Sequence, residues 1–481
     1  MASTANTATS NSVENRTSGL SHVIIASSAG TLIEWYDFYL YAILTVVLSG
    51  QFFPGSLATG FLFSLGALWA GFAVRPFGAA FFGHIGDLVG RKYTFLVTLS
   101  IMGLSTFCVG LLPTYQKIGM AAPVLLVLLR CLQGLALGGE YGGAATYVAE
   151  HAPDKQRGFY TSFIQTTATL GLFAALLIVL VTRIQLGDAA FQAWGWRIPF
   201  LLSIVLVGFS FYIRLKLKES PLFAKLKAEG KSSSSPIRDI TGRNWGMIAV
   251  ALFGATAGQA VVWYTGQFYC LVFLTKTLGV NYKDAYVMIA IALLCATPFF
   301  VFFGWLSDKI GRKPLILAGC AVAALTYWPI YHGMAASVTQ VGKVVTVNEP
   351  AMVALIFVQV LYVTIVYGPI AALLVEYFPA KIRYTSMSIP YHLGNGEFGG
   401  LTPLMATWIA AWYVANHPGS PNSKYMGLVW PITIASLTFV IGLIFLPETK
   451  DRRIWDEVNE PEPSYDGPGP ESTNWGRHDE V

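Results

Sequence analysis

The chain has 481 residues, of which 54% are hydrophobic and only 12% are Asp, Glu, Lys or Arg. Soluble globular chains carry roughly 25% charged residues, so the composition excludes a water-soluble domain, and it excludes disorder and coiled coil for the same reason. A mean hydropathy of +0.55 indicates a polytopic membrane protein. At ~20–25 residues per crossing helix, plus loops, the length allows about twelve crossings. The formal net charge of +5 does not indicate a nucleic-acid partner.

Apolar segments long enough to cross a bilayer as helices follow one another along the chain. They lie at about 22–50, 57–83, 94–112, 120–149, 159–182, 198–216, 245–275, 285–306, 314–335, 351–377, 386–415 and 426–447. The first residues are rich in Ser, Thr and Asn, and the last are charged and rich in Pro and Gly, which is typical of disordered tails. The sequence therefore predicts an all-α integral membrane protein with twelve transmembrane helices. Its expected parts are a tail (1–21), a six-helix half (22–216), a cytoplasmic linker (217–244), a second six-helix half (245–447) and a tail (448–481).

Lys and Arg are distributed unevenly between the loops on the two sides of this expected bundle. If the N-terminus is cytoplasmic, twenty of them lie on the inner side, linker included, and seven on the outer side. Because cytoplasmic loops carry the excess of Lys and Arg, both termini are expected in the cytoplasm. We expect a multi-pass protein of the plasma membrane, in a bacterium the inner membrane.

The two halves repeat each other. The stretch from Gly83 to Lys92 matches the stretch from Gly304 to Lys313 at an offset of 221 residues. Farther on, Glu150-His-Ala-Pro followed by Arg157 matches Glu376-Tyr-Phe-Pro followed by Arg383 at an offset of 226. Two six-helix units in parallel orientation predict a pseudo-symmetric bundle with a central site between its halves.

These motifs carry a family resemblance. The G-x-x-x-D-x-x-G-R-K loop, present twice, resembles the hallmark loop of the major facilitator superfamily. Further strings resemble the metabolite:proton symporter family, whose members carry proline and betaine, 2-oxoglutarate, citrate or shikimate. They are Glu34-Trp-Tyr-Asp37-Phe, Arg75-Pro-Phe-Gly78, Arg130-x-x-Gln133-Gly, Gly138-Gly-Glu140, Trp196-Arg-Ile-Pro-Phe200, Glu219-Ser-Pro-Leu-Phe223 and Leu393-Gly-Asn395-Gly. The resemblance covers nearly the whole chain apart from the tails and implies the major facilitator fold.

The repeated loops are the expected gate. Asp87 lies near a helix end, where a carboxylate can pair with an Arg or cap a neighbouring helix N-terminus, and the second repeat retains an Asp, Asp308, at the equivalent position. Such contacts between the halves would latch the inner side of the carrier. The alternative is that the basic residues only fix topology. The residues expected in gating are Arg75, Asp87, Arg91, Lys92, Glu150, Arg157, Asp308, Arg312, Lys313, Glu376 and Arg383.

Six charged residues fall inside predicted spans: Glu34, Asp37, Arg75, Arg130, Glu140 and Glu397. Each would cost ~2.5–3.5 kcal/mol at a lipid-facing helix centre, so they are expected to face a cavity or one another. Glu34, Asp37 and Tyr41 share one helix face, and Arg130, Gln133 and Glu140 share another. The alternative for any one of them is a static ion pair that holds helices together.

The expected roles follow from this placement. Glu34, Asp37 and Glu140 are the candidates for proton coupling, and Arg130 is the expected anchor of a substrate carboxylate, with Glu140 as its resting partner. The other residues expected to line the substrate site are Gln133, Tyr41, Gln259, Trp263, Gln267, Tyr362, His392, Asn395 and Glu397. His392 has packing as its alternative, and the glycines around Glu397 indicate a break in that helix.

The sequence has no phosphate-cradling loop, no metal-ligand spacing and no nucleophile elbow. We therefore expect no cofactor, no metal and no enzymatic activity. The favoured function is proton-coupled symport of a small organic anion or zwitterion by a monomer in the lipid bilayer, through alternating access. Uniport or antiport of the same substrates and, less favoured, a transport-like sensor are the alternatives.

Overall fold

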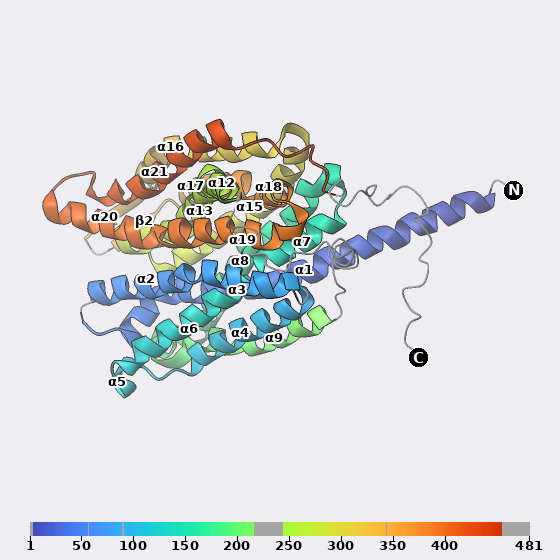
Figure 1. Cartoon of the computed structure of the whole chain (residues 1–481). Helices are drawn as coiled ribbons and strands as arrows, with labels where there is room; N and C mark the ends of the chain where they lie inside the picture. The colour runs from blue at the N-terminus through green and yellow to red at the C-terminus, as the bar shows by residue number, and fades with distance from the viewer. Residues whose placement is uncertain (1–2, 56, 89–90, 216–243, 343, 455–481) are drawn as a thin grey trace.

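The computed structural model describes residues 3–55, 57–88, 91–215, 244–342 and 344–454, which form a bundle of long helices (Figure 1). The helices of the first half are α1 (Ser3–Phe52), α2 (Leu57–Ala73), α3 (Arg75–Leu88), α4 (Arg91–Leu111), α5 (Tyr115–Ile118), α6 (Ala121–Gly138), α7 (Tyr141–His151), α8 (Arg157–Ala190) and α9 (Arg197–Leu215). A short 3₁₀ turn, η1 (Asp154–Gln156), precedes α8, and a π-helical turn, η2 (Phe191–Gly195), follows it.

The second half begins with one long helix that alternates between α and π geometry. Its parts are α12 (Trp245–Ala251), η3 (Leu252–Thr256), α13 (Ala257–Tyr264), η4 (Thr265–Tyr269), α14 (Cys270–Val272) and η5 (Phe273–Thr277). There follow α15 (Tyr282–Ile310), α16 (Arg312–Ala336), α17 (Glu349–Tyr367), α18 (Ile370–Tyr377), η6 (Ala380–Ile382), α19 (Arg383–Leu393), η7 (Gly394–Gly400), α20 (Thr402–Asn416), η8 (Ser423–Leu428) and α21 (Val429–Phe445). Between α16 and α17, β1 (Val338–Val341) and β2 (Val344–Val347) form an antiparallel hairpin in which Val338 faces Val347.

Most of the expected spans are present as long apolar helices. Among the described residues, nine helical segments are long and apolar enough to cross a membrane, and two shorter ones cover 96–111 and 197–212. The continuous run α19–η7–α20 supplies the remaining crossing. The chain is therefore a multi-pass membrane protein.

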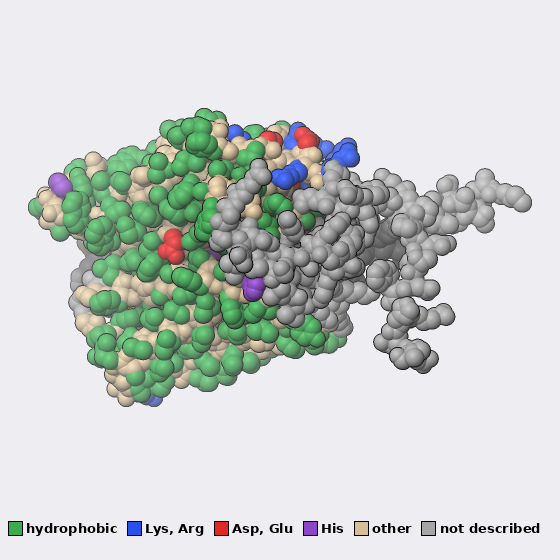
Figure 2. Space-filling view, in the orientation of Figure 1, with side chains coloured by type: hydrophobic (Ala, Val, Ile, Leu, Met, Phe, Trp, Pro, Cys, Tyr) green, Lys and Arg blue, Asp and Glu red, His purple; other side chains and the backbone are tan. Residues whose placement is uncertain are grey.

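The outer surface fits a lipid environment. Large apolar side chains such as Phe77 (71% exposed) and Leu325 (78% exposed) project from the helices. Figure 2 shows a mainly hydrophobic face, with the charged side chains gathered mostly toward the end from which the N-terminus projects. Such a surface is stable only against hydrocarbon.

The two halves form two layers, and in Figure 1 most of the first half lies below the second. α8 of the first half lies along α15 of the second, and α3 lies along α19. Elements far apart in the sequence thus form the interface on which a central site depends.

The ends of the chain differ from the sequence prediction in one respect. A disordered tail was expected over residues 1–21, whereas α1 is helical from Ser3 onward and projects from the bundle in Figure 1. Most of the expected linker (217–244) and of the expected C-terminal tail (448–481) lies outside the described residues.

Glycines let α6 approach α2 and α3 closely. A Cβ atom at Gly134 would overlap the carbonyl oxygen of Gly71, and one at Gly138 would overlap that of Arg75. Backbone-to-backbone packing through small residues is how membrane helices associate tightly. These contacts fix the position of Arg130 on α6 relative to Arg75.

We predict that Gly134→Ala destabilises the protein by about 1–3 kcal/mol, because the new methyl group has no space and α6 must move. Thermal unfolding of the purified protein in detergent measures the effect. The control is Gly66→Ala, since a Cβ atom at Gly66 meets no atom within 4 Å. Equal transition temperatures for the two variants would contradict the close packing.

Candidate functional site

The charged residues expected inside the membrane spans are buried, with one exception. Glu34, Asp37 and Arg75 are 0% exposed, Arg130 is 1% exposed and Glu140 is 2% exposed. Glu397 is the exception, because it is only half-buried. The cost of placing a charge in hydrocarbon thus explains why the first five face the interior.

Arg75 and Arg130 converge on one aromatic ring. The guanidinium carbon of Arg75 lies 4.3 Å from the centroid of Phe38, and that of Arg130 lies 4.5 Å from it. Arg75 also lies 4.4 Å from the ring of Phe72, and Arg130 lies 4.6 Å from that of Tyr41. Arg75 was expected in the gate near a helix end, but it stands at the break between α2 and α3, about midway along the crossing, and belongs to the central site.

Neither guanidinium group has a carboxylate partner among the described residues. Arg130 donates to Gln133 Oε1 at 2.5 Å, and Gln133 in turn donates to Thr106. The Nε and Nη2 atoms of Arg130, and all three side-chain nitrogens of Arg75, donate no hydrogen bond to any residue in the described part of the chain. The centre of the molecule therefore holds two concentrated positive charges.

The expected resting pair of Arg130 with Glu140 is not formed. The prediction assumed one continuous helix from Arg130 to Tyr141, but α6 ends at Gly138 and α7 begins at Tyr141. Glu140 lies at this break with φ −106° and ψ −53°. Ten helical residues also rise by about 15 Å, so a shared helix face would not by itself bring Glu140 within reach of Arg130.

The face of α1 carries Glu34, Asp37 and Tyr41 as expected. Asp37 is fully buried, with Ser203 of α9 beside it. No described Lys or Arg lies within 4 Å of its carboxylate, as an ion pair requires. Tyr41 donates to the carbonyl oxygen of Ser64 at 3.1 Å, so its hydroxyl joins α1 to α2 while its ring supports Arg130.

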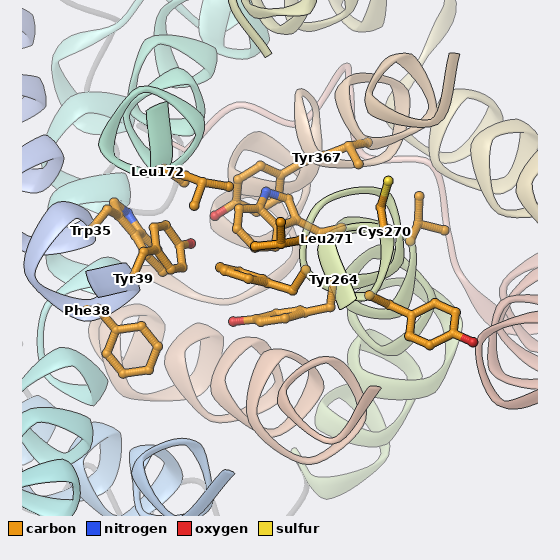
Figure 3. Close-up of a cluster of buried hydrophobic side chains, with 14 of the residues drawn as sticks. Trp35, Phe38, Tyr39, Leu172, Tyr264, Cys270, Leu271 and Tyr367 are labelled. Carbon is orange, nitrogen blue, oxygen red and sulfur yellow. The ribbon is translucent and has the colours of Figure 1, made fainter. Parts of the chain in front are cut away.

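Aromatic side chains from both halves enclose the arginines. Tyr39 of α1 stacks on Trp263 of α13 with centroids 5.3 Å apart, and Phe72 meets Tyr264 edge-on at 5.2 Å. Figure 3 shows Tyr39 and Phe38 on one side and Tyr264 on the other, projecting toward each other. Of these, sequence analysis named only Trp263. Phe38 and Tyr39 directly follow Asp37, but nothing in the sequence distinguishes an aromatic residue of the site from one of the core.

A second contact between the halves is made by tyrosines. The rings of Tyr141 and Tyr391 stack with centroids 3.5 Å apart, and Tyr391 shares a 2.5 Å hydrogen bond with Tyr367. His392 is buried beside them, 5.1 Å from the Tyr391 ring, and neither ring nitrogen has a hydrogen-bond partner within the described ranges. Tyr367 was missed by sequence analysis.

The polar residues expected from the second half divide into two groups. Gln259 and Asn395 face each other at 3.4–3.5 Å, and the buried amide of Gln267 has no hydrogen-bond partner among the residues that the structure describes. Tyr362 instead accepts from Thr326 of α16 and packs inside the second half. Glu397, the half-buried residue, lies beside Trp69 of α2, at the edge of the interface.

One end of the bundle is closed by ion pairs, and we call it the charged end. It comprises Glu150, Asp154, Arg157, Asp308, Arg312, Glu376 and Arg383. The repeated motifs pair crosswise, because Arg157 of the first half contacts Glu376 of the second at 3.0 Å and Arg383 contacts Glu150 at 3.6 Å. The sequence predicted Glu150, Arg157, Glu376 and Arg383 in one network, but neither their exchange of partners nor the part of Asp154.

Asp308, expected in the gate, caps a helix of the other half. Its carboxylate accepts from the backbone N–H groups of Gly158 and Phe159, at 2.9 and 2.8 Å, at the start of α8. Arg312 contacts both Asp308 and Glu376. The side chains of Asp87, Arg91 and Lys92, the equivalent residues of the first repeat, lie outside the described ones.

The segment after α21 joins the charged end. Glu448 accepts from the backbone N–H groups of Arg312 and Lys313, which begin α16, and Thr449 donates to Glu376 at 2.7 Å. Lys313 was expected in the gate, but its Nζ donates to the carbonyl oxygen of Leu443 within the second half. Within the described residues, no group of three or more His, Cys, Asp and Glu could hold a metal ion.

Comparisons with known proteins agree with this architecture. The sequence model of the family described as "Sugar (and other) transporter" matches residues 22–244 and 243–458. The chain is 34% identical over 422 residues to the inner membrane metabolite transport protein YhjE of Escherichia coli K12, covering 86% of this chain and 92% of that protein. It is 32% identical over 434 residues to the alpha-ketoglutarate permease of the same organism, covering 90% and 95%.

Another relative is the glycine betaine/proline/ectoine/pipecolic acid transporter OusA of Dickeya dadantii, 31% identical over 90% of this chain and 84% of that protein. Among solved structures, the proton:xylose symporter XylE, described as a major facilitator superfamily protein, superposes with a TM-score of 0.69 at 19% identity, covering 92% of this chain and 99% of that one. The relatives are named as transporters or permeases rather than as enzymes. This chain belongs to the sugar (and other) transporter family, within the major facilitator superfamily.

Proposed function

We propose that the protein is a proton-coupled symporter that carries a small organic carboxylate or zwitterion by alternating access. The observation that carries the proposal is the pair of buried guanidinium groups at Phe38, between the two halves, without a described carboxylate partner. A buried charge without a counter-charge is costly, and a substrate carboxylate would supply that counter-charge.

The chemistry of arginine favours a carboxylate over a neutral sugar. The planar guanidinium group can bind both oxygens of a carboxylate at once, and such charge-assisted bonds are about twice as strong as neutral ones. The names of the relatives are consistent with this, since they include carriers of alpha-ketoglutarate and of betaine and proline. For a zwitterion, the aromatic rings around the arginines offer faces to its cationic end.

The charged end is the proposed inner gate. Its cross-half contacts hold the halves together on that side, which corresponds to a carrier closed toward the cytoplasm. The Lys and Arg excess on the same side supports cytoplasmic termini, and the inner-membrane relative supports the bacterial inner membrane. Opening would require the halves to rock apart at Arg157 and Glu376.

Asp37 is the proposed proton carrier, with Glu34 as the second candidate. Both are buried on α1, and Asp37 directly precedes Phe38, whose ring supports both arginines. A change in the protonation of Asp37 therefore acts next to the proposed substrate anchor.

The experiment that tests the function is uptake into proteoliposomes with and without a proton ionophore. The panel contains succinate, 2-oxoglutarate, glycine betaine, proline and xylose. We expect accumulation of at least one carboxylate or zwitterion that the ionophore abolishes, and no uptake of xylose. Uptake that the ionophore leaves unchanged would point to uniport.

Neutralising the anchor should weaken substrate binding. We predict that Arg130→Gln raises the KM of the transported carboxylate roughly 10- to 150-fold, because it removes a charge-assisted interaction of about 1.5–3 kcal/mol. Arg75→Gln should have an effect in the same range. Arg197→Gln is the control, since Arg197 binds the backbone carbonyl oxygens of Gly110 and Leu112 away from the centre. The anchor role fails if all three variants have the KM of the wild type.

Removing the proposed proton carrier should uncouple substrate transport from the proton gradient. We predict that Asp37→Asn, which keeps the shape but cannot exchange a proton, still exchanges labelled for unlabelled substrate but no longer accumulates it. Glu34→Gln tests the second candidate, and Asp284→Asn is the control because Asp284 is exposed at the start of α15. Wild-type proton uptake per substrate in both test variants would remove the assignment.

Weakening the gate should expose the interface. Glu376 accepts from Arg157, Arg312 and Thr449, so Glu376→Gln leaves buried arginines without their counter-charge, at a cost of about 3–5 kcal/mol to the closed state. In a cysteine-free background, a Ser388→Cys probe on the buried face of α19 should then react at least about tenfold faster with a thiol reagent in inside-out vesicles.

The matched control is Lys313→Gln, which alters a charge at the same end but breaks no contact between the halves. Unchanged reactivity in the Glu376→Gln variant, with its folding verified by thermal unfolding, would show that the cross-half pairs do not hold this end closed.

A further inference from the structure

A cavity of about 250 Å³ lies between the halves at the end of the bundle opposite to the charged end. Its wall comes from α1 and α2, from the ends of α8 and η2, and from η4, α14, η5 and α15. A water molecule occupies roughly 30 Å³ of liquid, so the cavity has room for several water-sized groups. Both halves contribute to it, as a path to the central site requires.

The charged residues in the wall of the cavity are all basic. Its lining residues include Lys276 and Arg183 but no Asp or Glu. Arg183 already has an anionic partner, because its Nε contacts Asp188 at 2.8 Å, and its guanidinium carbon lies 3.1 Å from the centroid of the Tyr282 ring. Lys276 has no such partner, since no described carboxylate lies within ion-pair distance of its Nζ.

Lys276 reaches from one half to the other. Its Nζ lies 5.1 Å from the centroid of Phe61, which belongs to α2, whereas Lys276 itself belongs to η5. This cation–π contact is weak at an exposed position, about 0.5–1 kcal/mol. The ammonium group therefore stays available to an anion that comes into the cavity.

The floor of the cavity is part of the aromatic enclosure of the central site. Phe268 lines the cavity, and its ring lies 5.2 Å from that of Tyr39 and 5.5 Å from that of Trp263. Phe268 thus connects the cavity that Lys276 lines with the aromatic rings around the two buried arginines.

We propose that this cavity is an outer binding site in which Lys276 holds the carboxylate of the substrate before the aromatic layer opens. The inference rests on the proposed function, because it adds a second carboxylate site to the same transport path. A cation in a cleft with apolar walls raises the local concentration of anions and speeds their capture. The carboxylate then passes from Lys276 to Arg75 and Arg130 as Phe268 and Tyr39 move apart.

The test compares Lys276→Met with Lys276→Arg in proteoliposome uptake of succinate at low ionic strength. Methionine keeps the apolar stem beside Phe61 but removes the charge. We expect Lys276→Met to raise the KM about two- to fivefold, the range of an exposed ion pair, with the maximal rate unchanged. Lys276→Arg should keep the wild-type KM. The difference should shrink at high salt, because exposed charges are screened.

Lys424→Met is the matched control, since Lys424 also lies 5.1 Å from an aromatic centroid, that of Tyr425, but does not line the cavity. An equal KM change in both methionine variants, or a change that salt leaves intact, would overturn the outer site in favour of a general surface or packing effect. A wild-type KM in Lys276→Met would overturn it as well.

A binding measurement separates this inference from the proposed function. In Arg75→Gln/Arg130→Gln protein, weak succinate binding that disappears when Lys276→Met is added supports the outer site even if transport of succinate is absent. Succinate transport by the wild type, without any Lys276-dependent binding in the double variant, leaves the transporter proposal standing and removes the outer site.

Discussion

The cost of burying two guanidinium groups without a counter-charge organises the centre of this protein. Arg75 and Arg130 rest on the faces of Phe38, Phe72 and Tyr41. Cation–π contacts contribute about 2 kcal/mol or more when desolvated, which offsets only part of the cost of taking an ion out of water. These two charges and the aromatic rings that enclose them from both halves are the features on which the proposed carboxylate site rests.

At the charged end, the cost of burying arginines is offset by carboxylates instead of aromatic rings. There the arginines are matched with carboxylates, as Arg157 and Arg312 share Glu376 and each has an aspartate of its own. A buried ion pair contributes little net stability, because its attraction roughly balances the lost hydration. Such a network suits the proposed inner gate, because water would hydrate the charges again if the halves separated at this end.

Much of this arrangement could be predicted from the sequence, and what could not depends on three-dimensional detail. The spans, the repeat and the burial of Asp37, Arg75 and Arg130 follow from hydropathy and from the cost of charge in lipid. The expected pair of Arg130 with Glu140 fails because two residues ten positions apart can share a helix face and still lie about 15 Å apart along the axis. The position of Tyr367 rather than Tyr362 at the site depends on the rotation of α17, and a uniformly apolar helix leaves that rotation unmarked.

The two halves differ in what they contribute. Every fully buried charge at the centre belongs to the first half, whereas the second supplies aromatic rings and the amides of Gln259, Gln267 and Asn395. The contacts between them near the centre include ring pairs, each contributing about 0.5–1.5 kcal/mol beyond the burial of their area. A substrate that holds the arginines with its carboxylate and the rings with its body would bridge both halves, so its binding would act on the same contacts that control which end is open.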